Sequence, residues 1–227
     1  LVKGKYNILI SGATNSGKSS LLNALAEYIG QEERVITIED SAELQLFHVD
    51  NLVRLETRNA NVEGANEITM QDLIKASFRI IVGEVRGAEA MSMLQALSTG
   101  HSGSFSSIHA NSCRDALRRL ETMVLMGMDM PLGAIQGLIA SSVDILIHLG
   151  RCLNGERKIL EISEIKDYSR TEYETHTLFQ YDKDHGLGSR EDWFHVEKLK
   201  DYGQYEKYCE AVKLFREGRA EQKKAKA

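Results

Sequence analysis

The chain has 227 residues, of which 42% are hydrophobic and 27% are charged, and its formal net charge is −5. This length fits one main domain with an appendage and is short for two full domains. The acidic balance argues against a broad nucleic-acid-binding face, which needs clustered Lys and Arg, and no apolar run reaches the roughly eighteen residues of a membrane span. The cysteines form no CxxC pair, so neither a zinc site nor a disulfide framework is expected and a reducing cytoplasm fits best; they are Cys113, Cys152 and Cys209.

From residue 5 to about residue 149, apolar strand-like runs alternate with amphipathic helical segments. This alternation is typical of an α/β sheet with helices on both faces. Short buried strands are predicted at 7–11, 35–38 and 80–82. Helices are predicted at 18–29 and 89–98, each followed by a glycine that stops it.

The next segments continue the same pattern. Ser112 and Asp115 resemble a capping box at the start of a helix, and Pro131 suits the first turn of another helix that runs to residue 141. A strand is predicted at 143–149, followed by an Asn-Gly turn and a strand at 158–165 that pairs back as a hairpin. Residues 175–181 are a further candidate strand, and residues 206–227 read as a charged helix.

Regularity weakens after residue 166, which suggests a division into two units. Residues 1–165 are expected to form the main α/β domain and residues 166–227 a C-terminal appendage of hairpin and helix. The sequence begins at Leu1, without an initiator Met or a signal-like apolar stretch. We therefore expect a fragment whose own N-terminal part is missing.

Residues 12–19, GATNSGKS, match the phosphate-binding pattern GxxxxGK[ST] between a predicted strand and a predicted helix. Glycines let the backbone curl around an anion, and the helix N-terminus adds its positive end. Lys18 would reach the outer phosphates of a nucleotide and the Ser19 hydroxyl would ligate Mg²⁺. The expected nucleotide-binding residues are Gly12, Ala13, Thr14, Asn15, Ser16, Gly17, Lys18, Ser19 and Ser20.

Two predicted strands end in acidic residues. The strand at 35–38 leads into Glu39, Asp40 and Glu43, where an acceptor that polarises water would lie beside the phosphate turn. The alternative is a solvated strand end without a catalytic role. The strand at 80–82 leads through Gly83 to Glu84, the Walker B pattern in which a carboxylate reaches Mg²⁺ through water, although Asp is commoner there.

Residues 99–111, TGHSGSFSSIHAN, place His101 and His109 among small polar residues. Such a run is expected to be flexible, neither packing into a core nor keeping a helix. Two imidazoles in this setting suggest a site. A cap on the preceding helix or a place in the core is the alternative, and it is stronger for His101 than for His109.

Together these segments resemble the Walker A, Asp box, Walker B and His box of the bacterial secretion and type IV pilus motor ATPases, nearest to the Tad (Flp) pilus assembly branch. The resemblance implies a RecA-like P-loop NTPase domain with a mostly parallel sheet, using ATP and Mg²⁺. It implies that Glu43 polarises water, that Glu84 organises Mg²⁺, and that His101 and His109 sense the γ-phosphate. These residues, with Lys18, are the expected catalytic set, and Ser19 and Glu84 are the expected metal set.

The resemblance also implies partners. The family works as hexameric rings on the cytoplasmic face of the inner membrane, against a polytopic platform protein, with no membrane span of its own. Nucleic acid is an unlikely partner on composition. The family's N-terminal domain supplies arginines to the nucleotide, and the internal candidates here are Arg54, Arg58 and Arg86. The Arg-x-x-Pro-Asp-like segment that the family places before the Walker B strand is not found, because residues 77–79 run directly into Ile80; either this connection is shortened or residues are absent from the sequence there.

Three other functions stay open at this point. One is a nucleotide-gated assembly protein that binds ATP with little turnover. Another is a P-loop kinase, although no acceptor-binding lid is recognisable. The third is a DNA-conjugation motor that touches nucleic acid, which the acidic composition disfavours.

Overall fold

The computed structural model describes residues 1–60, 67–74, 79–100, 102–152, 154–169, 172–184, 186–189, 193 and 195–225. The strands within these residues are β1 (Ile8–Gly12), β2 (Arg34–Glu39), β3 (Asn51–Glu56), β4 (Ile80–Val85), β5 (Phe105–Ile108), β6 (Ile145–Arg151), β7 (Arg157–Ser169), β8 (Glu172–Asp182) and β9 (Gly186–Ser189). The helices are η1 (Val2–Gly4), α1 (Lys18–Ala26), α2 (Met70–Ile74), α3 (Glu89–Ser98), α4 (Cys113–Gly127), α5 (Leu132–Ser142), α6 (Glu197–Asp201) and α7 (Tyr205–Ala225).

All the described strands belong to one sheet, in the order β3-β2-β4-β5-β1-β6-β7-β8-β9. The pairings from β3 to β6 are parallel. The pairings from β6 to β9 are antiparallel. The mostly parallel sheet of the α/β prediction is therefore confirmed. Because the carboxyl ends of parallel strands meet at one edge, the segments that follow β1, β2, β4 and β5 lie close together.

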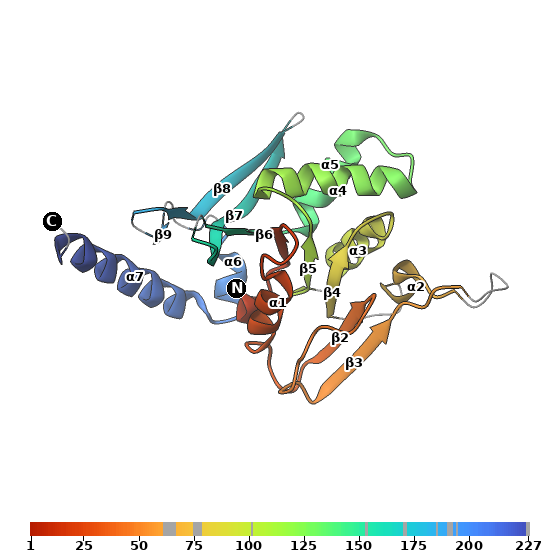
Figure 1. The fold of residues 1–227 in the computed structure, drawn as a ribbon, viewed down its shortest axis with the longest axis horizontal. Coiled ribbons are helices and arrows are strands. Elements are labelled where there is room, and N and C mark those ends of the chain that lie inside the picture. Colours follow the sequence, from red (N-terminus) through yellow and green to blue (C-terminus); the bar gives the residue numbers. More distant parts are fainter. Residues whose placement is uncertain are drawn as a thin grey trace.

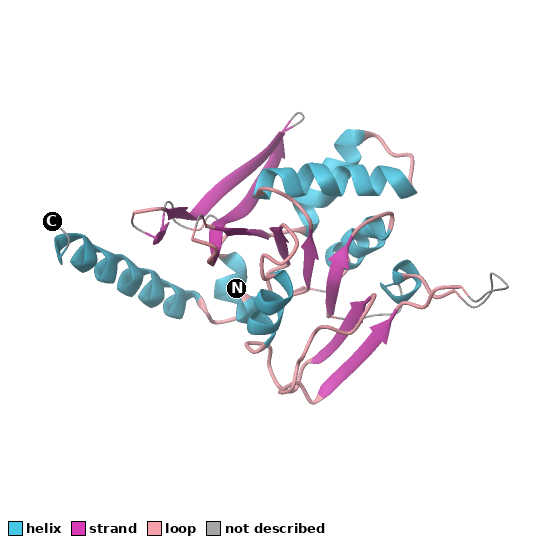
Figure 2. Ribbon diagram, viewed as in Figure 1, coloured by secondary structure: helices cyan, strands magenta, loops and turns pink. Residues whose placement is uncertain are grey.

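Helices cover both faces of the sheet (Figures 1 and 2). On one face α2, α3, α4 and α5 bury apolar residues against the strands, among them Leu94, Leu117 and Ile139. On the other face η1, α1 and α6 do the same, with Leu22 and Leu199 in the core. This burial removes apolar surface from water and is the main source of the fold's stability.

Several element boundaries follow the sequence closely. Helix α3 spans the predicted residues, and the capping box is present because the Ser112 hydroxyl accepts a hydrogen bond from the Asp115 amide at 3.0 Å. Pro131 is the residue just before α5 rather than part of its first turn. Helix α1 ends at Ala26, shorter than predicted, because the amides of Tyr28 and Ile29 turn back to carbonyls three residues earlier.

The expectation of a flexible segment at residues 99–111 is wrong for its second half. Residues 105–108 form β5, a central strand between β4 and β1, and Phe105 and Ile108 are 1% and 0% exposed. Two serines interrupt the apolar pattern by which a buried strand is recognised in a sequence, although both are buried in the sheet. The Ser107 hydroxyl donates to the Gly83 carbonyl at 2.6 Å, which satisfies it without water.

Strand β3 and helix α2 were not predicted. β3 is the edge strand beside β2, and its exposed or partly exposed residues include charges that mask the strand pattern. α2 has only five residues, too few for a helical period to be recognised in the sequence. The connection before the Walker B strand, residues 77–79, cannot be compared with the family's, because residues 77 and 78 lie outside the described residues.

Strands β7, β8 and β9 extend the sheet beyond β6, and helix α6 then packs on the same face as α1. β7 crosses the expected division at 165/166, so that division stays a prediction. The Lys198 ammonium contacts the Asp144 carboxylate at 2.6 Å, and the Tyr6 hydroxyl donates to the His195 carbonyl at 2.6 Å. Helix α7 then runs outward to the C-terminal end of the chain (Figure 1). Among the described helices, none is both long enough and apolar enough to cross a membrane.

Candidate functional site

The turn between β1 and α1 is built for close approach of its backbone to another group. A Cβ on Gly12 would lie 2.4 Å from the Ser16 hydroxyl and 2.8 Å from the Leu149 carbonyl oxygen, so a larger residue cannot stand there. Gly17 has φ 101°, a conformation that favours glycine, and Asn15 has φ 59°. The Ser16 amide closes the turn by donating to the Ala13 carbonyl at 3.2 Å.

Lys18 begins α1 and folds back over this turn. Its ammonium donates to the carbonyls of Gly12 at 3.1 Å and Ala13 at 3.3 Å. It also lies 3.9 Å from the Glu84 carboxylate. Burial lowers the pKa of Lys18, and the Glu84 carboxylate acts against that effect. The cation is thus held inside the loop that would surround an anion.

Ser19, the next residue of α1 after Lys18, contacts Glu43 from the loop after β2. The Ser19 hydroxyl donates to the Glu43 carboxylate at 2.9 Å. The loop that carries Glu43 is fixed by Glu39, whose Oε1 accepts hydrogen bonds from the amides of Glu43 at 3.0 Å and Leu44 at 3.1 Å. Glu39 is only 4% exposed, so the solvated strand end is ruled out at that residue.

Glu39 and Gly83 pack against each other across β2 and β4. A Cβ on Gly83 would lie 3.1 Å from Glu39 Cγ, which explains a glycine immediately before Glu84. Burial raises the pKa of Glu39, and the two amide hydrogen bonds partly offset that rise. Glu39 therefore positions the Glu43 loop rather than facing the solvent.

Glu84, at the end of β4, is the centre of a charged cluster. The Arg86 guanidinium contacts its Oε2 at 2.7 Å, and His109 Nε2 lies 2.7 Å from its Oε1. Arg86 also contacts Asp40 at 3.3 Å, which ties the end of β2 to the end of β4. Of the three internal arginine candidates, Arg86 alone lines the pocket described below, while Arg54 and Arg58 lie elsewhere.

His109 follows β5 directly and joins Glu84 to the phosphate turn. Its Nδ1 lies 3.5 Å from the Lys18 ammonium, on the side of the ring opposite the Glu84 contact. Burial, together with the charge of Lys18, lowers the pKa of His109 against the opposing effect of Glu84. The lowered pKa favours the neutral form of the ring. His101, the second predicted histidine, lies outside the described residues.

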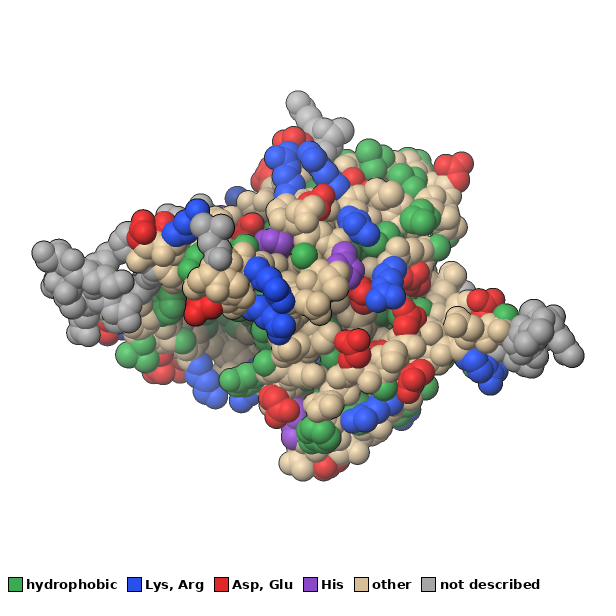
Figure 3. Space-filling model, in the orientation of Figure 1, with side chains coloured by type: hydrophobic (Ala, Val, Ile, Leu, Met, Phe, Trp, Pro, Cys, Tyr) green, Lys and Arg blue, Asp and Glu red, His purple; other side chains and the backbone are tan. Residues whose placement is uncertain are grey.

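These groups share one pocket of about 410 Å³. Figure 3 shows basic, acidic and histidine side chains close together near the centre of the visible face. Of the expected nucleotide-binding residues, the lining includes Thr14, Asn15, Gly17, Lys18, Ser19 and Ser20. Gly12, Ala13 and Ser16 form the turn behind them without lining the pocket.

The turn also fits an anion chemically. The Ser16 hydroxyl is buried and has no hydrogen-bond partner among the residues that the structure describes. The first amides of α1 have no partner inside the helix. A hydroxyl and two carboxylates beside a cationic turn are the donor set expected for a triphosphate with Mg²⁺.

Sequence reasoning missed one cation in this pocket. Arg157, from β7, lines the pocket on the far side of the turn from Glu84. The Asn-Gly turn predicts the hairpin but not its place, because only the pairing of β6 with β1 brings that hairpin beside the phosphate turn.

Comparisons with known proteins agree on one family. The family model described as Type II/IV secretion system protein matches residues 1–185. A putative conjugal transfer protein of Mycobacterium tuberculosis is 37% identical over 172 residues, which is 73% of this chain and 48% of that protein. The type IV secretion system protein PtlH of Bordetella pertussis is 40% identical over 153 residues, covering 63% of this chain and 45% of that protein. The chain thus spans about half the length of these relatives.

A solved structure supports the fold in the same way. The VirB11 ATPase from the Brucella suis type IV secretion system, in complex with sulphate, superposes with a TM-score of 0.65 at 32% identity. The match covers 72% of this chain and 49% of that one. The RecA-like fold is therefore shown. The narrower assignment to the Tad branch stays a prediction, since these relatives come from conjugation and type IV secretion.

Proposed function

Because the chain belongs to the Type II/IV secretion system protein family, we propose that it is the ATP-hydrolysing motor domain of a secretion or pilus assembly system. The observation that carries the proposal is the convergence of Lys18, Ser19, Glu43 and Glu84 on one pocket beside the turn after β1. A site that only binds an anion would need no more than the turn and Lys18. Two additional carboxylates on separate strands suit a reaction at the terminal phosphate.

Binding is assigned to the turn and the start of α1. The phosphates lie against the backbone of residues 12–19, and Lys18 exchanges its contacts with the turn carbonyls for contacts with phosphate oxygens. Ser19 and Glu84 are the residues that would hold Mg²⁺, directly or through water. When bound, that ion neutralises charge on the outer phosphate oxygens.

Hydrolysis is assigned to Glu43. A carboxylate beside the terminal phosphate can accept a hydrogen bond from water and orient its oxygen for attack on phosphorus. The Ser19 hydroxyl donates a hydrogen bond to this carboxylate and holds it beside the start of α1. Glu39 holds the loop, so Glu43 has little freedom to turn away.

Coupling is assigned to His109, which contacts both Glu84 and Lys18. A neutral imidazole donates one hydrogen bond, so loss of the γ-phosphate changes which group receives it. We place His101 in the same role by resemblance. We further propose a hexameric ring at the cytoplasmic face of the inner membrane, acting on a platform protein, with the Tad pilus system as the narrower assignment.

Phosphate release from Mg·ATP tests the proposal. The wild-type chain should release phosphate, Lys18→Ala should lose nucleotide binding, and Glu43→Gln should bind while hydrolysing at least about 10²-fold more slowly. Glu56→Gln is the matched control, because Glu56 is an exposed acid paired with Glu39 on the neighbouring strand. Glu43→Gln hydrolysis equal to that control would contradict the role of Glu43. ATP binding without any release by the wild type would favour a nucleotide-gated assembly protein.

The relatives described as conjugal transfer proteins favour a conjugation system as the second candidate. The chemistry at the pocket would be the same and the cargo would differ. Stimulation of phosphate release by single- or double-stranded DNA would support direct contact with nucleic acid. An unchanged rate would favour a protein cargo, as the acidic composition does.

A further inference from the structure

The hairpin of β6 and β7 places two arginines directly opposite each other. Arg151 pairs with Arg157 in the antiparallel register, on either side of a turn in which Gly155 has φ 81°. The Cys152 amide donates to the Glu156 carbonyl at 2.9 Å and closes the turn. Directly paired residues project from the same face of a two-stranded ribbon, so the two guanidinium groups share one side of the hairpin.

This pairing places two like charges next to each other at an exposed part of the hairpin. Like charges directly opposite each other in a sheet are destabilising. Among the residues that the structure describes, neither arginine forms an ion pair with an acid. Lys158, the next residue on β7, does have an acidic partner, because its ammonium contacts the Glu156 carboxylate at 2.9 Å. Glu156, the acid of the turn, is therefore paired with Lys158, and Arg157 lines the pocket beside the phosphate turn.

Both arginines reach the phosphate turn. Arg157 lines the pocket, and its Cδ lies 3.6 Å from the point where a Cβ on Gly17 would stand. Arg151 Nη2 lies 3.5 Å from the Asn15 carbonyl oxygen. The side chain of Arg157 thus passes over the start of α1, while Arg151 contacts the turn itself.

The sheet order fixes which side of the nucleotide they face. β5 lies on one side of β1, with β4 beyond it, and these strands carry His109 and Glu84. β6 lies on the other side of β1, with β7 beyond it. The hairpin therefore flanks the turn opposite the carboxylates that surround the reacting phosphate.

We propose that Arg157 binds the phosphate chain of the nucleotide in cis, on the side away from Glu84, and that Arg151 positions the turn beside it. The inference rests on the proposed function, because it assigns a residue to the same pocket. A guanidinium fork matches phosphate oxygens in two parallel hydrogen bonds. Because Arg157 lies on the side of the turn opposite Glu84, we assign it to the phosphates that ATP and ADP share, so it sets affinity rather than the rate of the chemical step.

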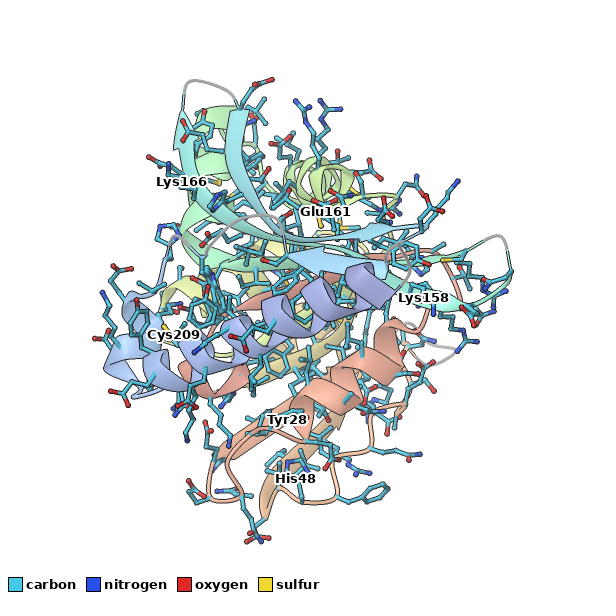
Figure 4. The ribbon with its side chains drawn as sticks, turned by 90° about the vertical axis from the view of Figure 1, so that its left-hand side faces the viewer. Tyr28, His48, Lys158, Glu161, Lys166 and Cys209 are labelled. Atoms are coloured by element: carbon cyan, nitrogen blue, oxygen red, sulfur yellow. The ribbon has the colours of Figure 1, made fainter. Side chains whose placement is uncertain are left out.

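Nucleotide titrations on the 227-residue chain test this assignment. Arg157→Gln should weaken both Mg·ADP and a non-hydrolysable Mg·ATP analogue by about tenfold, the scale of a charge-assisted contact. Its kcat at saturating ATP should stay within about twofold of the wild type, and Arg157→Lys should recover part of the affinity. Lys158→Gln is the control and should bind like the wild type; Lys158 is labelled in Figure 4.

Two further readouts separate a ligand contact from a structural role. Without nucleotide, Arg157→Gln should melt at the same temperature as the wild type or higher, because a like-charge pair is removed. A lower melting temperature would indicate a structural role and overturn the inference. Guanine nucleotides, if they bind, should lose as much affinity as adenine nucleotides, and a loss confined to adenine would assign Arg157 to the base instead.

The outcomes distinguish this inference from the proposed function. A wild-type chain that binds nucleotide, with Arg157→Gln binding equally well, overturns the role of Arg157 and leaves the pocket assignment standing. A fall in kcat with unchanged affinity would also overturn it. A wild-type chain that binds no nucleotide overturns both.

Discussion

The role of Glu39 gives the sharpest structural prediction. Glu39 is buried at the edge of the pocket, and its Oε1 accepts hydrogen bonds from the amides of Glu43 and Leu44. Replacing it by alanine removes the only acceptor that the structure assigns to these two described amides. Glu39→Gln keeps one acceptor oxygen in nearly the same shape. The pair of variants therefore separates the hydrogen bonds from the charge.

The expected magnitude follows from the two amides. A buried donor left without a partner costs about 1–3 kcal/mol. Water from the adjoining pocket can reach the loop, so the low end for each amide is appropriate, about 2 kcal/mol in all. At 1.36 kcal/mol per factor of ten, this corresponds to a fall in kcat of about 30-fold for Glu39→Ala. Glu39→Gln should stay within about threefold of the wild type.

Hydrogen exchange and phosphate release together measure the effect. In Glu39→Ala the amides of Glu43 and Leu44 should exchange faster, while nucleotide affinity stays near that of the wild type. Glu56→Ala, from the paired exposed position on β3, should change neither quantity. A folded Glu39→Ala chain with wild-type kcat and unchanged protection at Glu43 would refute the reasoning.

Three other predictions concern single residues. Gly12→Ala should abolish nucleotide binding, measured by titration, because its Cβ would lie 2.4 Å from the Ser16 hydroxyl; binding within twofold of the wild type would show that the turn can relax. Ser112→Ala should lower the free energy of unfolding by about 1 kcal/mol through loss of the α4 cap, measured by urea denaturation, and an unchanged midpoint would contradict the cap. Burial raises the pKa of Glu39 above its unfolded value, so the carboxyl contributes stability at acid pH that is lost as the pH rises through the folded value. Glu39→Gln does not titrate in this range, so its free energy of unfolding should rise relative to the wild type between acid and neutral pH. A difference between the two that does not depend on pH would contradict the shift.

Much of the fold could be predicted because local and long-range signals agree. The strand before residue 12, the glycines of the turn and the apolar face of α1 all indicate the same strand-turn-helix unit. β5 could not be recognised, because its serines give no apolar strand pattern, and the acceptor for the Ser107 hydroxyl lies on β4, far away in the sequence. The same holds for β3, whose charged residues suit a sheet edge as well as a loop.

The residues of the site could be predicted from the sequence, but several of the contacts between them could not. Lys18, Ser19, Glu43, Glu84 and His109 meet in one pocket, as the order of the motifs indicates. The burial of Glu39 depends on its packing against Gly83, a contact between two strands that lie far apart in the sequence. Arg157 was missed for a similar reason, since only the sheet order brings β7 near the turn.

The central claim is that a triphosphate lies against residues 12–19 with Glu43 and Glu84 on either side of its outer phosphate. A crystal structure of the chain with Mg²⁺ and a non-hydrolysable ATP analogue tests this directly. The account predicts that Lys18 leaves the carbonyls of Gly12 and Ala13 for phosphate oxygens, with both carboxylates directed at the terminal phosphate or its metal. A nucleotide bound elsewhere, or one whose terminal phosphate neither glutamate approaches, would contradict it.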